Sequence, residues 1–209
     1  MNQPRIKVCG MTSIQQVQEL AALGADYAGF IFYEKSPRFV ADKISVDALK
    51  AFTGIQKVGV FVNESVERIL QVVADYRLHA VQLHGDETPA FCKILSAETT
   101  VIKAFRIRGN ENLTEILNPY EESVDYFLFD TKAQEYGGTG KKFDWSVLER
   151  ASINKPFFLS GGIGVDDAEQ VKAFTNNNNV FSLDVNSKFE IASGVKDMEQ
   201  VQRFMKAIH

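Results

Sequence analysis

The strongest constraint on the fold is a set of eight short apolar runs that recur at nearly even intervals along the 209 residues. Each run is too short for a helix, is rich in Val, Ile and Phe, and meets polar residues or glycine at its C-terminal end. That pattern is typical of buried parallel strands. The sequence therefore predicts eight such strands, at residues 6–9, 27–32, 58–62, 80–83, 101–105, 126–129, 156–159 and 180–183.

Segments with apolar residues at helical spacing separate these runs. They lie at residues 14–23, 46–52, 66–76, 89–96, 113–117, 145–150, 167–174 and 198–208. Residues that favour a helix start precede several of them, namely Thr12 or Ser13, Ser65, Thr88 followed by Pro89, and Asp144.

Eight strands alternating with eight helices predict an α/β fold of the closed (β/α)8 type, the TIM barrel. A doubly wound open sheet is the alternative, and it would carry a Gly-x-Gly-x-x-Gly turn after its first strand. The sequence there is Cys9-Gly10-Met11-Thr12, which does not provide that turn. We expect residues 1–209 to form one compact barrel domain. The four asparagines at 176–179 are expected to form an irregular turn without a function.

Composition excludes several classes of partner. The formal net charge is −4 and the pI is near 5.5, so no positive field is available to bind nucleic acid. No run approaches the roughly 20 apolar residues of a membrane span, and no membrane partner is expected. Residues 1–7 are polar, unlike a signal peptide. Two cysteines, Cys9 and Cys92, in a chain of this size indicate a reducing compartment, and we expect a cytoplasmic protein.

The active site of such a barrel lies at the C-terminal ends of its strands. Strand alternation places Cys9 on the same face as Lys7, and Asp130 on the same face as Leu128. The other face must pack against helices, so Cys9 and Asp130 are expected to point into the barrel mouth. A thiolate and a protonated carboxyl together suit proton transfer within one substrate. The alternative, a buried apolar cysteine and a capping aspartate, carries about equal weight on spacing alone.

Glycine-containing segments follow the last two strands, where barrels of this kind often bind phosphate through backbone N–H groups. They include Gly161 and Gly162 after the seventh strand, and Ser193 and Gly194 after the eighth. Tight turning alone is the alternative explanation for such glycines. The glycine-rich stretch at 137–140 is either a loop that closes over substrate or a flexible connector.

Three further side chains have competing interpretations. Arg38 has a planar fork suited to a carboxylate, although most arginines are simply solvated. Lys103 is a candidate Schiff-base lysine of an aldolase, but pairing with a carboxylate is the commoner role of such a lysine. His84 has no second His or Cys at ligand spacing, so no metal site is expected.

Several motifs together resemble the phosphoribosylanthranilate isomerase family, in the same order over nearly the whole chain. They are Ile6-Lys7-Val8-Cys9-Gly10-Met11-Thr12, Ser36-Pro37-Arg38, Gly59-Val60-Phe61-Val62-Asn63, Val81-Gln82-Leu83-His84-Gly85, Phe129-Asp130-Thr131, Gly138-Thr139-Gly140, Phe143-Asp144-Trp145 and Ser160-Gly161-Gly162-Ile163. The resemblance implies a barrel of the ribulose-phosphate-binding type.

The resemblance also implies an activity in tryptophan biosynthesis, the Amadori rearrangement of N-(5-phosphoribosyl)anthranilate to 1-(2-carboxyphenylamino)-1-deoxyribulose 5-phosphate. No cofactor or metal is implied, and the partner is a small phosphosugar handled by a monomer or homodimer. Asp130 would be the general acid that opens the furanose ring, and Cys9 the general base that removes the C2′ proton. Arg38 would hold the anthranilate carboxylate.

The implied phosphate site is Gly161 and Gly162 together with the segment after Asp184, and further pocket residues are Lys7, His84 and Asp184. The chain departs from the family after the eighth strand, where Asn186-Ser187-Lys188 replaces a Ser-Ser-Gly pattern. The phosphate-binding role therefore falls on some of four residues, namely Ser187, Lys188, Ser193 and Gly194.

Two other functions compete with the isomerase. One is a barrel that binds a phosphosugar without converting it, which the presence of both proton-transfer residues opposes. The other is a related enzyme such as indole-glycerol-phosphate synthase. That reaction should require Lys and Glu at several strand ends, where this chain has Cys9 and Asp130.

Overall fold

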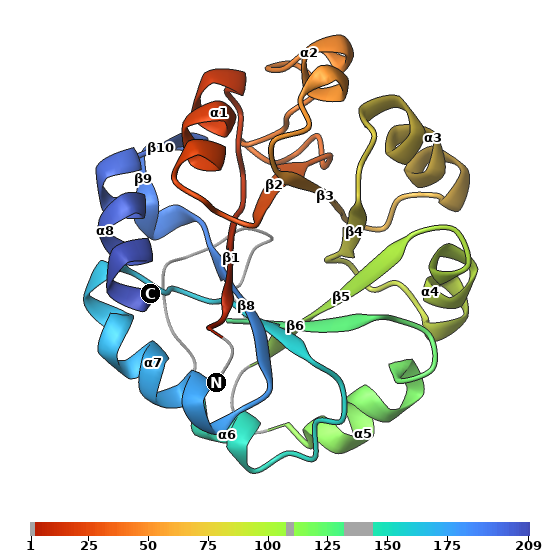
Figure 1. The fold of residues 1–209 in the computed structure, drawn as a ribbon. Helices are drawn as coiled ribbons and strands as arrows, with labels where there is room; N and C mark the ends of the chain where they lie inside the picture. Colours follow the sequence, from red (N-terminus) through yellow and green to blue (C-terminus); the bar gives the residue numbers. More distant parts are fainter. Residues whose placement is uncertain (1–2, 108–110, 132–143) are drawn as a thin grey trace.

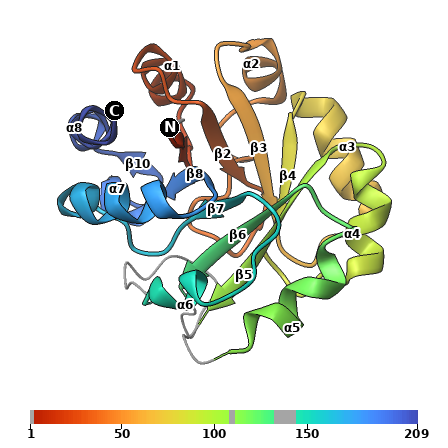
Figure 2. The same cartoon turned by 60° about the horizontal axis from the view of Figure 1, so that its bottom comes forward.

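The computed structural model describes residues 3–107, 111–131 and 144–209. Eight parallel strands form a closed barrel in consecutive order, with β1 paired to β8. Helices surround the barrel on its outside (Figure 1), and the ring of helices closes where α8 packs beside α1 and α7 (Figure 2). The predicted (β/α)8 barrel is confirmed.

Each predicted apolar run coincides with a strand, with small differences at the ends. The barrel strands are β1 (Arg5–Val8), β2 (Tyr27–Ile31), β3 (Gln56–Phe61), β4 (Ala80–Leu83), β5 (Thr100–Ile107), β6 (Tyr126–Thr131), β7 (Phe157–Leu159) and β8 (Val180–Val185).

Four of the predicted helices have the observed bounds, and the others differ by a few residues. The helices are α1 (Ile14–Ala22), α2 (Val46–Ala51), α3 (Val66–Tyr76), α4 (Pro89–Ser96), α5 (Leu113–Leu117), α6 (Ser146–Glu149), α7 (Ala168–Asn177) and α8 (Met198–Ile208). Short 3-10 turns are η1 (Asn118–Tyr120), η2 (Val165–Asp167) and η3 (Ser187–Phe189).

Most of the expected helix starts are capped as predicted. Ser13, rather than Thr12, caps α1 by accepting from the N–H of Gln16. Ser65 and Thr88 cap α3 and α4 in the same way. The side-chain oxygen at each start satisfies a backbone donor that the helix itself leaves without a partner.

Two local features differ from the expectation. The asparagine tract was expected to form an irregular turn, but α7 continues through Asn177. The side-chain amides of Asn177 and Asn178 donate to the carbonyls of Ala173 and Phe174, at 3.1 and 2.9 Å, and so support the last turn of α7. The second difference is a small antiparallel hairpin after β8, made of β9 (Glu190–Ala192) and β10 (Val195–Lys196).

Strand alternation divides the buried apolar residues into two groups, as predicted. Ile6 and Val8 of β1, and Phe127 and Phe129 of β6, belong to the layer between barrel and helices. A smaller cluster fills the barrel interior, namely Tyr27, Val58, Ala80, Ile102, Ala104, Leu128 and Phe158, with Tyr126 and Phe181 packed against it. Because this cluster closes the interior below, polar side chains at the strand ends face a pocket and not a channel.

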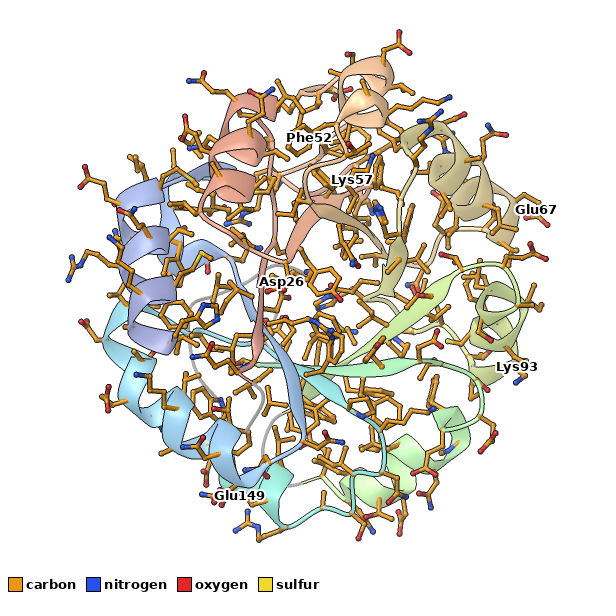
Figure 3. The ribbon with its side chains drawn as sticks, in the orientation of Figure 1. Asp26, Phe52, Lys57, Glu67, Lys93 and Glu149 are labelled. Atoms are coloured by element: carbon orange, nitrogen blue, oxygen red, sulfur yellow. The ribbon has the colours of Figure 1, made fainter. Side chains whose placement is uncertain are left out.

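Some charged residues lie on the outer surface of the helices, and others lie near the barrel, where backbone groups bind them. Glu67, Lys93 and Glu149 lie on the outer rim of the helices, whereas Asp26 lies close to the barrel (Figure 3), where it accepts from the N–H of Ile6 at 2.8 Å. Lys57 of β3 is buried, and its ammonium donates to the carbonyls of Leu49 and Tyr76 at 2.8 and 2.9 Å. It therefore satisfies the C-terminal ends of α2 and α3, where a cation is favoured.

Of the helices in the described ranges, none is long and apolar enough to cross a membrane.

The interior cluster makes a stability prediction. Ile102 is 1% exposed inside the barrel, whereas Ile94 on α4 is 57% exposed. We expect Ile102→Ala to lower the free energy of unfolding by about 2–5 kcal/mol, because it removes buried contacts and leaves a cavity. The matched Ile94→Ala should change it by less than about 0.5 kcal/mol. Urea unfolding measures both values, and equal effects of the two variants would contradict the assignment of Ile102 to the core.

Candidate active site

A pocket opens at the C-terminal ends of the barrel strands. It is lined by residues from seven of the eight strands or from the loops that follow them. They are Cys9, Ile31, Tyr33, Ser36, Arg38, Val60, Val62, Gln82, His84, Asp130, Ser160, Gly161, Gly162, Ile163, Asp184, Asn186, Ser187 and Lys188. The structure therefore brings Cys9, Asp130, Arg38, His84 and Asp184 to one cavity, as the sequence predicted.

Cys9 lies beside a buried ion pair at the seam where the barrel closes. The register of β1 against β8 places Lys7 opposite Asp184, and the Lys7 Nζ lies 2.8 Å from Asp184 Oδ1 with both side chains buried. Gly29 of β2 provides the space for this group. A Cβ at Gly29 would lie 2.8 Å from Cys9 Sγ and 3.1 Å from Lys7 Nζ. The thiol and the ammonium are therefore packed together against the same glycine.

The charges of this group oppose the effect of burial. Burial raises the pKa of the Cys9 thiol, while the ammonium of Lys7 acts to lower it. Burial would lower the pKa of Lys7, but the Asp184 carboxylate and Cys9 outweigh it and the pKa of Lys7 is raised. Burial likewise raises the pKa of Asp184 against the effect of Lys7. Lys7 therefore stays an ammonium and offsets part of the effect of burial, while the pKa of Cys9 remains above its ordinary value.

The second cysteine lies outside the pocket. Cys92 on α4 is fully buried in the layer between barrel and helices and does not line the pocket. Burial raises its pKa to about 11. Cys92 therefore remains a thiol and serves as packing.

Asp130 lies at the other side of the pocket, where one hydrogen-bond donor and the His84 ring contact its carboxyl group. The N–H of Thr131 donates to Asp130 Oδ1 at 2.7 Å, and His84 Nε2 lies 3.5 Å from Asp130 Oδ2. The amide nitrogen of Gln82 lies 3.0 Å from His84 Nδ1. With Gln82 donating, Nδ1 accepts and the ring proton is on Nε2, directed at Asp130. The Asp130 carboxyl therefore lies beside His84 in the pocket lining.

The loop after β7 has the backbone form of an anion cradle. Gly161 has a φ of +95°, and a Cβ there would lie 2.5 Å from Thr131 Oγ1, so only glycine fits without displacing its neighbour. Within the described parts of the chain, the backbone N–H groups of Gly161, Gly162, Ser187 and Lys188 donate no hydrogen bond. Several free amides at one pocket wall are a suitable site for phosphate oxygens.

Arg38 is buried and bound, which excludes the interpretation as a solvated arginine. Its Nε and Nη2 donate to the two carboxylate oxygens of Glu190 at 2.8 and 2.6 Å. Lys196 Nζ also lies 2.7 Å from Glu190. Burial opposes the ionisation of Glu190, but the hydrogen bonds from Arg38 and Lys196 outweigh it and lower the pKa of Glu190 to about 2.

Some of the candidate residues lie away from the pocket. Ser193 and Gly194 form the turn of the β9–β10 hairpin, where the carbonyl of Gly194 accepts from Thr12 Oγ1 at 2.6 Å. Neither lines the pocket, whereas Ser187 and Lys188 do. Lys7 does not line the pocket itself but contacts Asp184, which does. The stretch at 137–140 lies outside the described residues.

Lys103 does not reach the pocket. It alternates with the interior residues Ile102 and Ala104 of β5, so its side chain lies on the opposite face. Its Nζ is 3.0 Å from Glu87 Oε2 and also donates to the carbonyls of Leu83 and Gly85, at 3.2 and 2.9 Å. The ammonium is bound by the loop that follows β4, and nothing in these contacts supports a Schiff-base role.

Sequence reasoning missed the partners that hold the named residues in place. Gln82 was quoted only as part of a motif, and Gly29, Glu190 and Lys196 were assigned no function. Strand alternation was sufficient to place Gln82 in the interior, because the preceding residue packs outward. Glu190 and Lys196 lie in the short β9–β10 hairpin, whose contacts no periodicity of the sequence predicts.

Among the described residues, no group of three or more His, Cys, Asp or Glu side chains is arranged to hold a metal ion.

Comparison with known proteins identifies the family. The model of the family described as N-(5′-phosphoribosyl)anthranilate (PRA) isomerase matches residues 6–207. An N-(5′-phosphoribosyl)anthranilate isomerase of Parabacteroides distasonis is 42% identical over 208 residues, which cover 97% of this chain and 92% of that protein.

Solved structures agree. The phosphoribosyl anthranilate isomerase of Thermotoga maritima superimposes with a TM-score of 0.82 and 35% identity, covering 98% of each chain. A phosphoribosyl anthranilate isomerase in complex with reduced 1-(o-carboxyphenylamino)-1-deoxyribulose 5-phosphate gives a TM-score of 0.79 at 32% identity, again covering 98% of each chain. With matches of this extent in sequence and in structure, the chain belongs to the N-(5′-phosphoribosyl)anthranilate isomerase family.

Proposed function

We propose that the pocket converts N-(5′-phosphoribosyl)anthranilate to 1-(2-carboxyphenylamino)-1-deoxyribulose 5-phosphate, an Amadori rearrangement of tryptophan biosynthesis. The observation that carries this proposal is the placing of a thiol next to a buried ammonium in the same pocket as a partly exposed carboxyl. The reaction needs one group that gives a proton and one that takes a proton, on a single small substrate. The substrate is a phosphosugar, like the reduced compound bound by the related isomerase.

The first step is ring opening by Asp130. Its protonated carboxyl gives a proton to the furanose ring oxygen, and the bond between that oxygen and C1′ breaks with the help of the anthranilate nitrogen lone pair. A protonated Schiff base results, and Asp130 is left as a carboxylate. The N–H of Thr131, which donates to Asp130, and the nearby His84 ring then stabilise that carboxylate.

The second step is proton removal by Cys9. The thiolate takes the proton from C2′, and the electron pair of that C–H bond moves toward the Schiff-base nitrogen, giving an enolamine. The enolamine takes up a proton at C1′ and loses the proton of its C2′ hydroxyl, which becomes the ketone. Lys7 supports this step because its ammonium stabilises the thiolate and so offsets part of the burial that raises the pKa of the Cys9 thiol.

Substrate binding divides between two walls of the pocket. The free amides of Gly161, Gly162, Ser187 and Lys188 are placed to hold the phosphate, and Lys188 adds a positive charge. Arg38 is placed to hold the anthranilate carboxylate. Ser193 and Gly194 are not part of this proposal, since they stand in the hairpin turn.

Turnover measurements test the two catalytic roles. We expect Cys9→Ser and Asp130→Asn each to lower kcat by about 10² or more, because each removes a positioned base or acid. The matched control Cys92→Ser should keep the wild-type kcat, since Cys92 is buried away from the pocket. A continuous assay of phosphoribosylanthranilate consumption, run with and without a chelator, measures these values. Near-normal turnover by both variants would refute the roles, and binding without turnover by the wild type would favour a binding-only barrel.

The pairing of Lys7 with Cys9 is testable without substrate. Lys7 lowers and Asp184 raises the pKa of Cys9, so the two substitutions have opposite signs. We expect Lys7→Met to slow alkylation of Cys9 by iodoacetamide at pH 8 by at least about tenfold, since each unit of pKa changes the thiolate fraction about tenfold. Asp184→Asn should speed it. Mass spectrometry of the labelled peptide measures the rates.

Lys57→Met is the control for this experiment, because it also removes a buried ammonium. The Lys57 ammonium contacts the ends of α2 and α3 and not Cys9. It should leave the alkylation rate unchanged. Shifts of the same sign for Lys7→Met and Asp184→Asn would show that general loosening of the barrel, not charge, controls the thiol.

A further inference from the structure

We propose that Glu190 is a positioning residue that turns one edge of the Arg38 guanidinium toward the substrate and so makes the enzyme selective for an arylamine with a carboxylate. This inference rests on the proposed function and deepens it. Glu190 lies in β9, outside the pocket lining, and acts only through Arg38.

The hydrogen bonds define which edge of Arg38 remains available. A guanidinium has five N–H groups arranged in a plane. Glu190 accepts from Nε and from Nη2, so it occupies the side edge of the group. The end edge, formed by Nη1 and the second N–H of Nη2, has no hydrogen-bond partner elsewhere in the described chain. That edge has the spacing that binds a carboxylate through two parallel hydrogen bonds.

The stem of Arg38 is confined as well. A Cβ at Gly10 would lie 2.7 Å from Arg38 Cδ and 2.8 Å from Asn186 Oδ1. Arg38 therefore lies directly against the backbone that follows β1. With the stem packed and one edge bonded, the guanidinium has a single orientation at the pocket wall, and little rotamer entropy remains to be lost on binding.

The cluster around Glu190 leaves Arg38 able to bind a second carboxylate. Glu190 contacts both Arg38 and Lys196, so its carboxylate is shared between two buried groups. Asn186 oxygens also accept from Lys196. A substrate carboxylate at the end edge of Arg38 would give the guanidinium a second charged acceptor. Glu190 also keeps the two groups apart by accepting from both.

A pair of probes that differ by one carboxyl group tests the inference. The first probe is reduced 1-(o-carboxyphenylamino)-1-deoxyribulose 5-phosphate, and the second is the same compound with a phenylamino group. We expect Glu190→Gln to weaken binding of the first probe by at least about tenfold, as loss of a charge-assisted, oriented bond predicts. Binding of the second probe should change by less than about twofold. Titration calorimetry measures both, and Glu169→Gln on the exposed face of α7 is the matched control.

Turnover and double substitution separate positioning from a general structural role. In Glu190→Gln the KM should rise by more than kcat falls, and Arg38→Met with Glu190→Gln should bind the first probe no more weakly than Arg38→Met alone. If Glu190→Gln does not fold, Glu190→Asp serves in its place, because it keeps the charge but withdraws the carboxylate from Arg38.

Equal loss of both probes would overturn the proposal and leave Glu190 as a structural residue, as would full retention of both. Failure of the proposed function has a different outcome, namely wild-type protein that binds neither probe.

Discussion

The buried pair between Lys7 and Asp184 is the interaction on which both the closure of the barrel and the chemistry of its pocket depend. The two residues are register partners across the seam that joins β1 to β8, the only barrel seam between strands at opposite ends of the sequence. An ion pair in an apolar interior fixes the strand register more strongly than ladder hydrogen bonds alone. A slipped register would leave each charge buried without its partner. Cys9 follows Lys7 by two residues, so its side chain lies on the same face of the strand, closer to the pocket.

This coupling explains why strand alternation was enough to predict the centre of the site. The period of two places Lys7, Cys9 and Asp130 inside the barrel, and the rule that barrel sites lie at strand C-termini selects the last of each series. Strand alternation did not predict the contacts made by residues outside the barrel strands. Glu190 is 152 residues from Arg38 along the chain, and a contact over that distance depends on the path of the β9–β10 hairpin, which no local pattern encoded. The asparagine tract was misjudged for a related reason, since side-chain bonds to α7 carbonyls overrode the turn preference of asparagine.

The segment after β8 shows how a departure from the family pattern is accommodated. Glycine would let a phosphate approach the backbone closely, and Lys188 stands in its place. Lys188 is exposed and belongs to the short η3 turn, so its side chain does not fill the cradle, while its amide remains free of partners within the described chain. For the proposed phosphate site, this arrangement keeps the backbone amide available to an anion and adds an ammonium. Gly194 has a structural task instead, because its φ of +81° and its contact with Thr12 fix the hairpin turn.

The proposed roles separate chemistry from recognition. The residues proposed for proton transfer, Cys9 with Lys7, lie on β1 and directly after it, where the barrel fixes their side chains. The residues proposed to recognise the aromatic carboxylate, Arg38 and Glu190, lie on the β2 loop and the hairpin and form an ion pair. Substitutions in the hairpin can thus change which amine is accepted while leaving the register of β1 and β8 intact, because Glu190 contributes nothing to the seam. A change at Lys7 or Asp184 has no such freedom, since it disturbs the closing ion pair and the thiol together.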